Sequence, residues 1–257
     1  MNASEPLAAH SWVRELMALV RGYAATVWGA VALRFGLARP PQGSVAFFQY
    51  RQRWNLAARD AFGFDMCVDG PRPAPVGAGP GTLIVANHAG FADLNVLISE
   101  TPPEAKLNFV AKIEAGEVPI FGWHLKHFGD LLLDRADPAA RAELIERALA
   151  RLEHGFSVGL FPEGTRSRDG RPKRTVHLAL IEAAIRAGIA VQPVAISGTL
   201  GLIEDCRRRH HGHPIHVRFG RARRDYQDAK DVWSDVLRMW DEIANARQCA
   251  LDLRPER

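Results

Sequence analysis

The sequence has little of what holds small secreted domains together. Its 257 residues include only three cysteines, Cys67, Cys206 and Cys249, an odd number at wide spacing, so we expect no disulfide framework and a reducing compartment. No short apolar run with a small-residue cleavage site follows the first basic residue, Arg14, so we expect no signal peptide. Within the apolar stretch 12–37 the longest uncharged run has 12 residues, whereas a membrane-spanning helix needs roughly 20.

The overall composition is that of a globular protein with a small excess of positive charge. Apolar residues make up 47% and charged residues 24% of the chain, and the mean hydropathy is −0.13; these values exclude a disordered chain and a polytopic membrane protein. The length suits one large domain or two small ones, with a core that needs no disulfide or metal. A formal net charge of +4 favours an anionic partner, which leaves membrane, nucleic acid and phosphorylated substrate open.

Residues 1–64 are predicted to form two amphipathic helices that face a membrane. Apolar residues recur every three or four positions in the first: Trp12, Leu16, Leu19, Tyr23, Val27, Val31 and Phe35. Arginines accompany this stripe, so we expect the helix to lie in the plane of a membrane surface. A helix packed on the protein body and a true membrane span are the alternatives. A second helical pattern begins at residue 45 and ends at Gly63.

Residues 65–257 are predicted to form an α/β domain with a largely parallel sheet flanked by helices. Short apolar runs predict strands buried on both faces at 82–86, 107–111, 130–133, 157–161, 191–196 and 215–219. Helical patterns cover 138–154, with Asp137 as the N-cap, then 176–187 and 226–253. Alternation of strands and helices over such a length is typical of a parallel sheet.

Two polar residues follow the first predicted strand. His88 comes just after strand 82–86, and Asp93 follows five residues later. In an open parallel sheet, reactive groups collect where strands end and loops meet in a crevice. On one continuous helix the two side chains would point about 140° apart, so they meet only if His88 lies in the turn and Asp93 in the first helical turn. The carboxylate would then hold one imidazole nitrogen and leave the other as a base. A turn histidine and a helix-capping aspartate are the plainer alternative.

A second strand end carries a glutamate and an arginine around a glycine turn. Strand 157–161 runs into Glu163, Gly164, Thr165 and Arg166, and further basic residues stand at 168, 171, 173 and 174. Such a turn is suited to holding an anion, because the arginine guanidinium is a forked donor. A solvated basic loop is the alternative for this feature alone.

The two strand ends together resemble the glycerolipid acyltransferase family, and most closely its bacterial 1-acylglycerol-3-phosphate acyltransferases. The likeness rests on His-x4-Asp at 88–93 and Phe-Pro-Glu-Gly-Thr-Arg-Ser at 161–167. Two weaker blocks agree: Phe-Val-Ala-Lys at 109–112, with Val-Pro-Ile-Phe-Gly-Trp at 118–123 and Asp-Arg at 134–135, and Val-Gln-Pro-Val-Ala-Ile-Ser at 191–197. The blocks follow the family's order over residues 82–198.

The resemblance implies a reaction and a role for each site residue. An acyl group would pass from a thioester donor, acyl-CoA or acyl carrier protein, to the hydroxyl of 1-acylglycerol-3-phosphate and give phosphatidic acid, with no cofactor. His88 would be the general base and Asp93 its orienting partner. The acceptor-binding residues would be Glu163, Gly164, Thr165 and Arg166, with Arg135 and Lys112 as further phosphate ligands. The enzyme would be peripheral or monotopic at the cytoplasmic face of the cell membrane, with anionic lipid as a partner.

The sequence departs from the family pattern in two places. Gly90 stands where many members have serine, and Lys173 and Arg174 stand where a Phe-Lys-x-Gly segment is usual. Both departures leave the acceptor open, so another lyso-lipid, such as a lyso-ornithine lipid, is an alternative. A non-catalytic lipid-binding protein on the same scaffold is another.

A basic stretch near the C-terminus, residues 206–224, contains seven arginines and four histidines. It lacks interleaved aromatic residues and a paired-ligand spacing, so we expect neither nucleic-acid binding nor a metal site. A surface that faces anionic lipid or an acidic carrier protein is the expectation, and a solvated face is the alternative.

Overall fold

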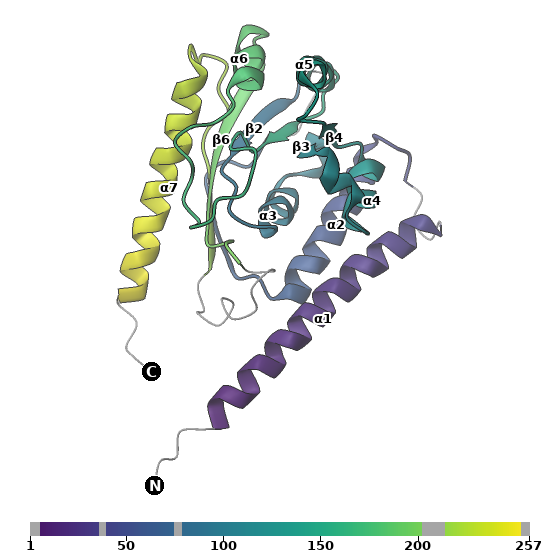
Figure 1. Cartoon of the computed structure of the whole chain (residues 1–257), viewed down its shortest axis with the longest axis vertical. Helices are drawn as coiled ribbons and strands as arrows, with labels where there is room; N and C mark the ends of the chain where they lie inside the picture. The colour runs from purple at the N-terminus through teal and green to yellow at the C-terminus, as the bar shows by residue number, and fades with distance from the viewer. Residues whose placement is uncertain (1–5, 36–39, 75–78, 202–213, 253–257) are drawn as a thin grey trace.

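A seven-stranded, largely parallel sheet forms the centre of the molecule. The computed structural model describes residues 6–35, 40–74, 79–201 and 214–252 (Figure 1). The strands are β1 (Met66–Asp69), β2 (Thr82–Ala86), β3 (Asn108–Lys112), β4 (Leu131–Leu133), β5 (Val158–Leu160), β6 (Ala190–Ser197) and β7 (Ile215–Phe219). They lie in the order β1-β7-β6-β2-β5-β3-β4, and each neighbouring pair is parallel except β6 with β7. The predicted α/β class is confirmed.

Helices cover both faces of the sheet (Figure 1). They are α1 (Pro6–Arg34), α2 (Val45–Phe62), α3 (Ala92–Glu100), α4 (Phe121–Phe128), α5 (Pro138–Glu153), α6 (Ala179–Arg186) and α7 (Ala229–Asp252), with 3-10 turns η1 (Pro103–Ala105) and η2 (Ile113–Glu117). Side chains of α5, α6 and α7 share one apolar core with Leu83 and Val85 of β2. Side chains of α3 pack on the other face with Ile84 and Phe109. β2 is thus buried on both faces, as expected of a central parallel strand.

One edge of the sheet differs from the prediction. β1 was not predicted; its four residues alternate between half-buried and exposed and pair only with β7. β7 itself alternates between buried and half-buried residues, so it is not buried on both faces. α6 begins at Ala179 rather than at Val176; in the segment before it the amide of His177 donates to the main-chain oxygen of Pro162 (2.8 Å), and Val176 and Leu178 line a cavity.

α1 packs along α2 and leaves an apolar face uncovered. A Cβ at Gly22 or Gly29 would come within 2.4 Å of the rings of Phe62 or Trp54, so the two helices touch closely at these glycines. On the outer side, apolar side chains are 41–71% exposed: Leu16, Met17, Val20, Tyr23, Val27, Trp28 and Phe35. The side chains of Trp12 and Leu19 lie outside the described part of the chain. By length and composition alone, residues 16–33, with a mean hydropathy of 1.5, are also apolar enough to cross a membrane.

A buried arginine joins α2 to the sheet. Arg51 is 1% exposed, and its guanidinium donates to the main-chain oxygen of Leu107 (2.7 Å) and to the carboxylate of Asp130 (2.6 Å). The same carboxylate accepts the amide of Phe109 at the start of β3 (2.7 Å). Burial raises the pKa of Asp130, and the Arg51 charge opposes that rise. Buried contacts therefore cross the boundary predicted between residues 64 and 65.

Candidate active site

His88 and Asp93 meet at the carboxyl end of β2. His88 lies in the turn after the strand and Asp93 in the first turn of α3, and His88 Nδ1 is 2.7 Å from Asp93 Oδ2. Asp93 is fully buried, and its Oδ2 also accepts the amides of Ala89 (2.7 Å) and Gly90 (2.9 Å). Because a carboxylate only accepts hydrogen bonds, Nδ1 carries the hydrogen and Nε2 keeps its lone pair. The geometry is that of an oriented base.

Two further side chains fix the turn that carries His88. Asn87 is 1% exposed. Its side-chain Nδ2 donates to the main-chain oxygen of Ile196 (2.8 Å), and its Oδ1 accepts the main-chain N–H of Ile196 (2.7 Å). These two bonds join the end of β2 to β6. The ring of Phe161 stacks on the imidazole with centroids 4.3 Å apart. Sequence reasoning gave neither residue a role. For Asn87 the signal was a polar side chain at the end of a buried strand, since such a group needs a main-chain partner.

Glu163 bridges two loops behind the histidine. It is 6% exposed; Oε2 accepts the amide of His88 and Oε1 the amide of Lys173, both at 2.7 Å. The amide of Ser167 donates in turn to the main-chain oxygen of His88 (2.8 Å). Burial raises the pKa of Glu163, while the amide bonds of Lys173 and His88 oppose the rise. Within the described chain Glu163 is not part of the cavity wall, so the geometry does not give it the direct acceptor contact that we expected.

A cavity of about 1090 Å³ opens beside His88 and extends between the sheet and its helices. Its inner walls are apolar: Val110, Leu125, Leu133, Leu144, Ile145, Leu160 and Leu180. This volume is at the upper end of small-molecule sites. The cavity therefore has the size and the lining for a long hydrocarbon chain.

Cationic side chains also line the cavity. Among the described lining residues these are Lys112, Arg135, Arg141, Arg166 and Arg168, and Glu114 is the one carboxylate. All the predicted acceptor residues except Glu163 thus lie on the same cavity as His88. Gly164 has a φ of 69°, and a Cβ there would lie 3.0 Å from Nη2 of Arg135, so glycine lets that guanidinium approach the turn. Burial lowers the pKa of Arg135, and Glu114 opposes this.

Arg166 lies on an aromatic side chain from the histidine turn. Its guanidinium carbon is 3.9 Å from the centroid of Phe91, a distance at which the ring attracts the cation. Phe91 also makes an edge contact with Phe121 of α4, with centroids 6.5 Å apart. Phe91 was not predicted as a site residue, because an aromatic residue beside a motif is uninformative until its stacking partner is known.

The structure gives a physical reason for Gly90 and shows which bonds Lys173 makes. A Cβ at Gly90 would come within 2.3 Å of the main-chain oxygen of Thr199, so a serine would not fit without a backbone shift. Lys173, which stands in the place of the usual Phe-Lys-x-Gly segment, makes hydrogen bonds with both its main chain and its side chain. Its amide donates to Glu163, its ammonium donates to the main-chain oxygen of Thr165 (3.1 Å), and its own carbonyl accepts the indole N–H of Trp233 (3.0 Å).

Two other kinds of site are not supported by the described residues. Residues 155–159 fit the Gly-x-Ser-x-Gly pattern of serine hydrolases, but Ser157 is fully buried just before β5, and its Oγ lies 3.3 Å from the amide of Thr82. A nucleophile elbow instead exposes its serine after a strand. No group of three or more metal-ligating side chains is found in the described ranges. His210, His211 and His213 of the basic stretch lie outside those ranges.

Comparison with known proteins assigns the family. A family model described as acyltransferase matches residues 65–197, about half of the chain. The chain belongs to this acyltransferase family. The predicted resemblance to glycerolipid acyltransferases is confirmed, since similar proteins carry the names of such enzymes.

This acyltransferase is similar to proteins named for two different acceptors. It is 37% identical over 183 residues to a lyso-ornithine lipid O-acyltransferase of Pseudomonas aeruginosa, covering 67% of this chain and 66% of that protein. It is 36% identical over 117 residues to a chloroplastic 1-acyl-sn-glycerol-3-phosphate acyltransferase of Arabidopsis thaliana, covering 46% of this chain and 32% of that protein. The matches thus span from about a third to just under two thirds of these relatives.

A solved structure shows the same fold. The 1-acyl-sn-glycerophosphate acyltransferase of Thermotoga maritima aligns over 96% of this chain and 100% of its own, with a TM-score of 0.69 and 21% identity. At this identity the comparison establishes the fold and does not identify the acceptor.

Proposed function

We propose that this acyltransferase moves a fatty acyl group from acyl-CoA or acyl carrier protein to the free hydroxyl of 1-acylglycerol-3-phosphate and so makes phosphatidic acid. The charge of the cavity carries this proposal. Five cationic side chains and a single carboxylate are found among its described lining residues. A phosphomonoester dianion is a group that arginine forks bind in a bidentate manner.

His88 acts as the general base in this reaction. Its Nε2 removes the proton from the acceptor hydroxyl while the oxygen attacks the thioester carbonyl. The new C–O bond gives a tetrahedral intermediate, and its collapse breaks the C–S bond. The departing thiolate takes the proton from the imidazolium, so the base is regenerated. Asp93 keeps Nδ1 protonated and stabilises the imidazolium between the two steps, and no cofactor takes part.

The remaining predicted residues hold the acceptor. Arg166, Arg135 and Lys112 bind the phosphate, with Gly164 and Thr165 forming the turn that lets the guanidinium groups converge. Glu163 acts through the main chain: it accepts the amides of His88 and Lys173. It thereby sets the distance between the base and the loop after β5 that carries Arg166, which we call the arginine loop. The apolar inner wall accommodates hydrocarbon from either substrate.

The site works at a membrane in this proposal, because the acceptor is a lipid. The exposed apolar face of α1 attaches the enzyme to the cytoplasmic face of the cell membrane in a peripheral or monotopic manner. Anionic phospholipid is its partner there, and nucleic acid is not.

Acylation of a lyso-ornithine lipid is the second candidate. The relative named for that acceptor matches this chain over 183 residues, against 117 for the Arabidopsis enzyme. An ornithine headgroup carries an ammonium group at the end of its side chain as well as a carboxylate, so it offers less net negative charge to the cationic cavity than a phosphomonoester does.

A panel of acceptors tests these candidates. Purified enzyme is incubated with lysophosphatidate, a lyso-ornithine lipid and lysophosphatidylcholine, each with acyl-CoA or acyl carrier protein, and thiol release is followed. We expect kcat/KM to be highest with lysophosphatidate. A preference for the lyso-ornithine lipid would change the proposed acceptor but not the proposed acyl transfer. Absence of turnover with every acceptor would point to a lipid-binding protein.

A further inference from the structure

Large apolar side chains on the described surface are exposed at two main places. One is the outer face of α1. The other consists of Phe91, Ile113, Val118 and Ile120, which are 36–45% exposed and which we call the apolar rim. Phe91 and Val118 line the cavity, and Ile113 and Ile120 are chain neighbours of the lining residues Lys112 and Phe121. The apolar rim therefore stands at the mouth of the cavity. Entry of a water-soluble substrate would not require exposed apolar side chains at this place.

The backbone holds one rim residue in an unfavourable conformation. Ile120 has a φ of 64° and a ψ of −54°, and the amide of Phe121 donates to the main-chain oxygen of Pro119 (2.7 Å). This is a γ-turn with positive φ, which is rare and strained, above all for a β-branched residue. Strained conformations of this kind persist where surrounding structure enforces them, commonly at functional sites. Here the result is that an isoleucine side chain is held in solvent.

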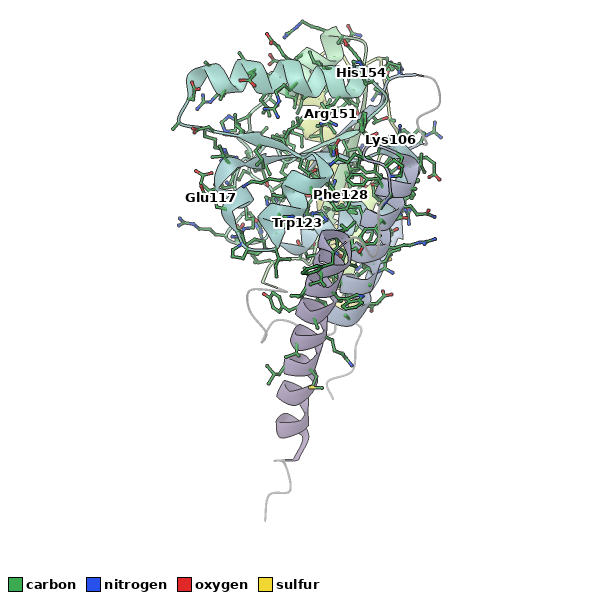
Figure 2. The ribbon with its side chains drawn as sticks, turned by 90° about the vertical axis from the view of Figure 1, so that its right-hand side faces the viewer. Lys106, Glu117, Trp123, Phe128, Arg151 and His154 are labelled. Atoms are coloured by element: carbon green, nitrogen blue, oxygen red, sulfur yellow. The ribbon has the colours of Figure 1, made fainter. Side chains whose placement is uncertain are left out.

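The apolar rim is connected to α1 through rigid packing. α4 follows Ile120 directly, and its Trp123 contacts Trp54 of α2 with ring centroids 6.5 Å apart; Trp54 also lies against Gly29 of α1. Figure 2 shows Trp123 close to the upper part of α1, and Glu117, at the end of η2, on the same half of the body, away from His154. The rim and the apolar face of α1 thus keep a fixed relation to each other.

We propose that the apolar rim inserts into the headgroup region of an anionic phospholipid membrane, as a second attachment point beside α1, and that the cavity mouth opens into that layer. The inference rests on the proposed function. A lysophospholipid would then enter the cavity without its acyl chain crossing water, while its phosphate meets the cations at the mouth.

The charges beside the apolar rim favour a lipid surface over a second copy of this chain as the partner. Lys112 directly precedes Ile113, and the guanidinium of Arg166 lies over Phe91. Two exposed glutamates, Glu114 and Glu117, also stand beside the rim, but the described lining of the cavity that opens there has five cations and one carboxylate. Apolar tips flanked by basic residues are characteristic of segments that bind anionic membranes. A second copy of this chain would instead bring the same cations against these, which would repel it.

A fluorescent label on the rim tests the insertion without any need for turnover. The three native cysteines are replaced by serine, and Ile113→Cys is labelled with a nitrobenzoxadiazole dye; the control is Asn245→Cys, on an exposed position of α7. On adding vesicles of phosphatidylglycerol and phosphatidylcholine, we expect blue-shifted emission and a rise of about two-fold or more at position 113 and no change at 245. Vesicle binding with no change at position 113 would overturn the proposal. So would a response to protein concentration without vesicles, which would indicate contact between copies.

A kinetic comparison tests the consequence for the reaction. The double variant Ile113→Ser/Ile120→Ser removes apolar surface without changing charge, and Val45→Ser, at a position 39% exposed at the start of α2, is the matched control. We expect the apparent KM for vesicle-borne lysophosphatidate to rise about ten-fold in the double variant. kcat/KM for a short-chain, water-soluble acceptor should stay near wild type in both variants. Equal loss on both acceptors, or loss on neither, would refute insertion of the rim. Absence of turnover in the wild type would count against the proposed function and leave the fluorescence result to decide on the rim.

Discussion

At the scale of single residues, the proposed reaction uses one imidazole as its base. Asp93 occupies Nδ1 of His88 at 2.7 Å, so only Nε2 can take the proton of an acceptor hydroxyl. We expect His88→Ala to lower kcat by about 10² to 10⁴ with the fold intact, the usual range for loss of a general base. His154→Ala, at the exposed C-terminal end of α5, is the control. More than a tenth of wild-type turnover in folded His88→Ala would mean that another group is the base.

Glu163 provides a test that separates positioning from binding. In Glu163→Gln one of the two main-chain amides, that of His88 or Lys173, meets an NH₂ group instead of an oxygen. A buried donor without an acceptor costs about 1–3 kcal/mol, so we expect a lower Tm together with a several-fold lower kcat. The KM for the acceptor should change little. If Glu163 instead binds the acceptor directly, the same variant should raise KM and leave Tm nearly unchanged.

At the scale of helices and strands, the hydrophobic pattern predicted six of the seven strands in the described chain, including the edge strand β4, and missed β1 at the other edge. β2 matched because five consecutive buried residues can only be a central strand or a buried helix, and flanking glycine and proline exclude the helix. β1 was missed because Met66–Asp69 is half-exposed and pairs with one neighbour from far along the chain. The His88–Asp93 contact was predictable from spacing. The bonds of Glu163 were not, because its partner Lys173 is placed by a long irregular loop.

The link between α2 and the sheet is a second test at this scale. Arg51 and Asp130 are both buried, and removing one leaves the charge of the other without a partner, which costs about 3–5 kcal/mol. We therefore expect Arg51→Ala to lower the midpoint of urea unfolding markedly. Arg59→Ala, on the same helix and paired with the partly buried Glu100, should have a smaller effect, because both side chains of this pair still reach solvent. Similar unfolding midpoints for the two variants would show that α2 is not held by the buried pair.

At the scale of the whole molecule, the proposed base and the exposed apolar face of α1 are joined by continuous packing. Asn87 fixes the end of β2 to β6, β2 presents His88, and the arginine loop after β5 closes the other side of the cavity. α4 lines the cavity with some of its side chains and contacts α2 through an aromatic side chain. In the proposed function, membrane contact through α1 thus sets where the base lies relative to the lipid surface.

The outer face of α1 should therefore control how much enzyme reaches the membrane. Leu16, Val20 and Val27 are 41–55% exposed and do not cover α2. Changing all three to serine removes about 1 kcal/mol of apolar burial per residue at about 25 cal/mol per Å², so we expect vesicle partitioning, measured by co-sedimentation, to fall about a hundred-fold. Turnover of a short-chain, soluble acceptor should persist, because no changed side chain touches the cavity. Undiminished partitioning of the triple variant would show that α1 is a packing helix and that the membrane is bound elsewhere.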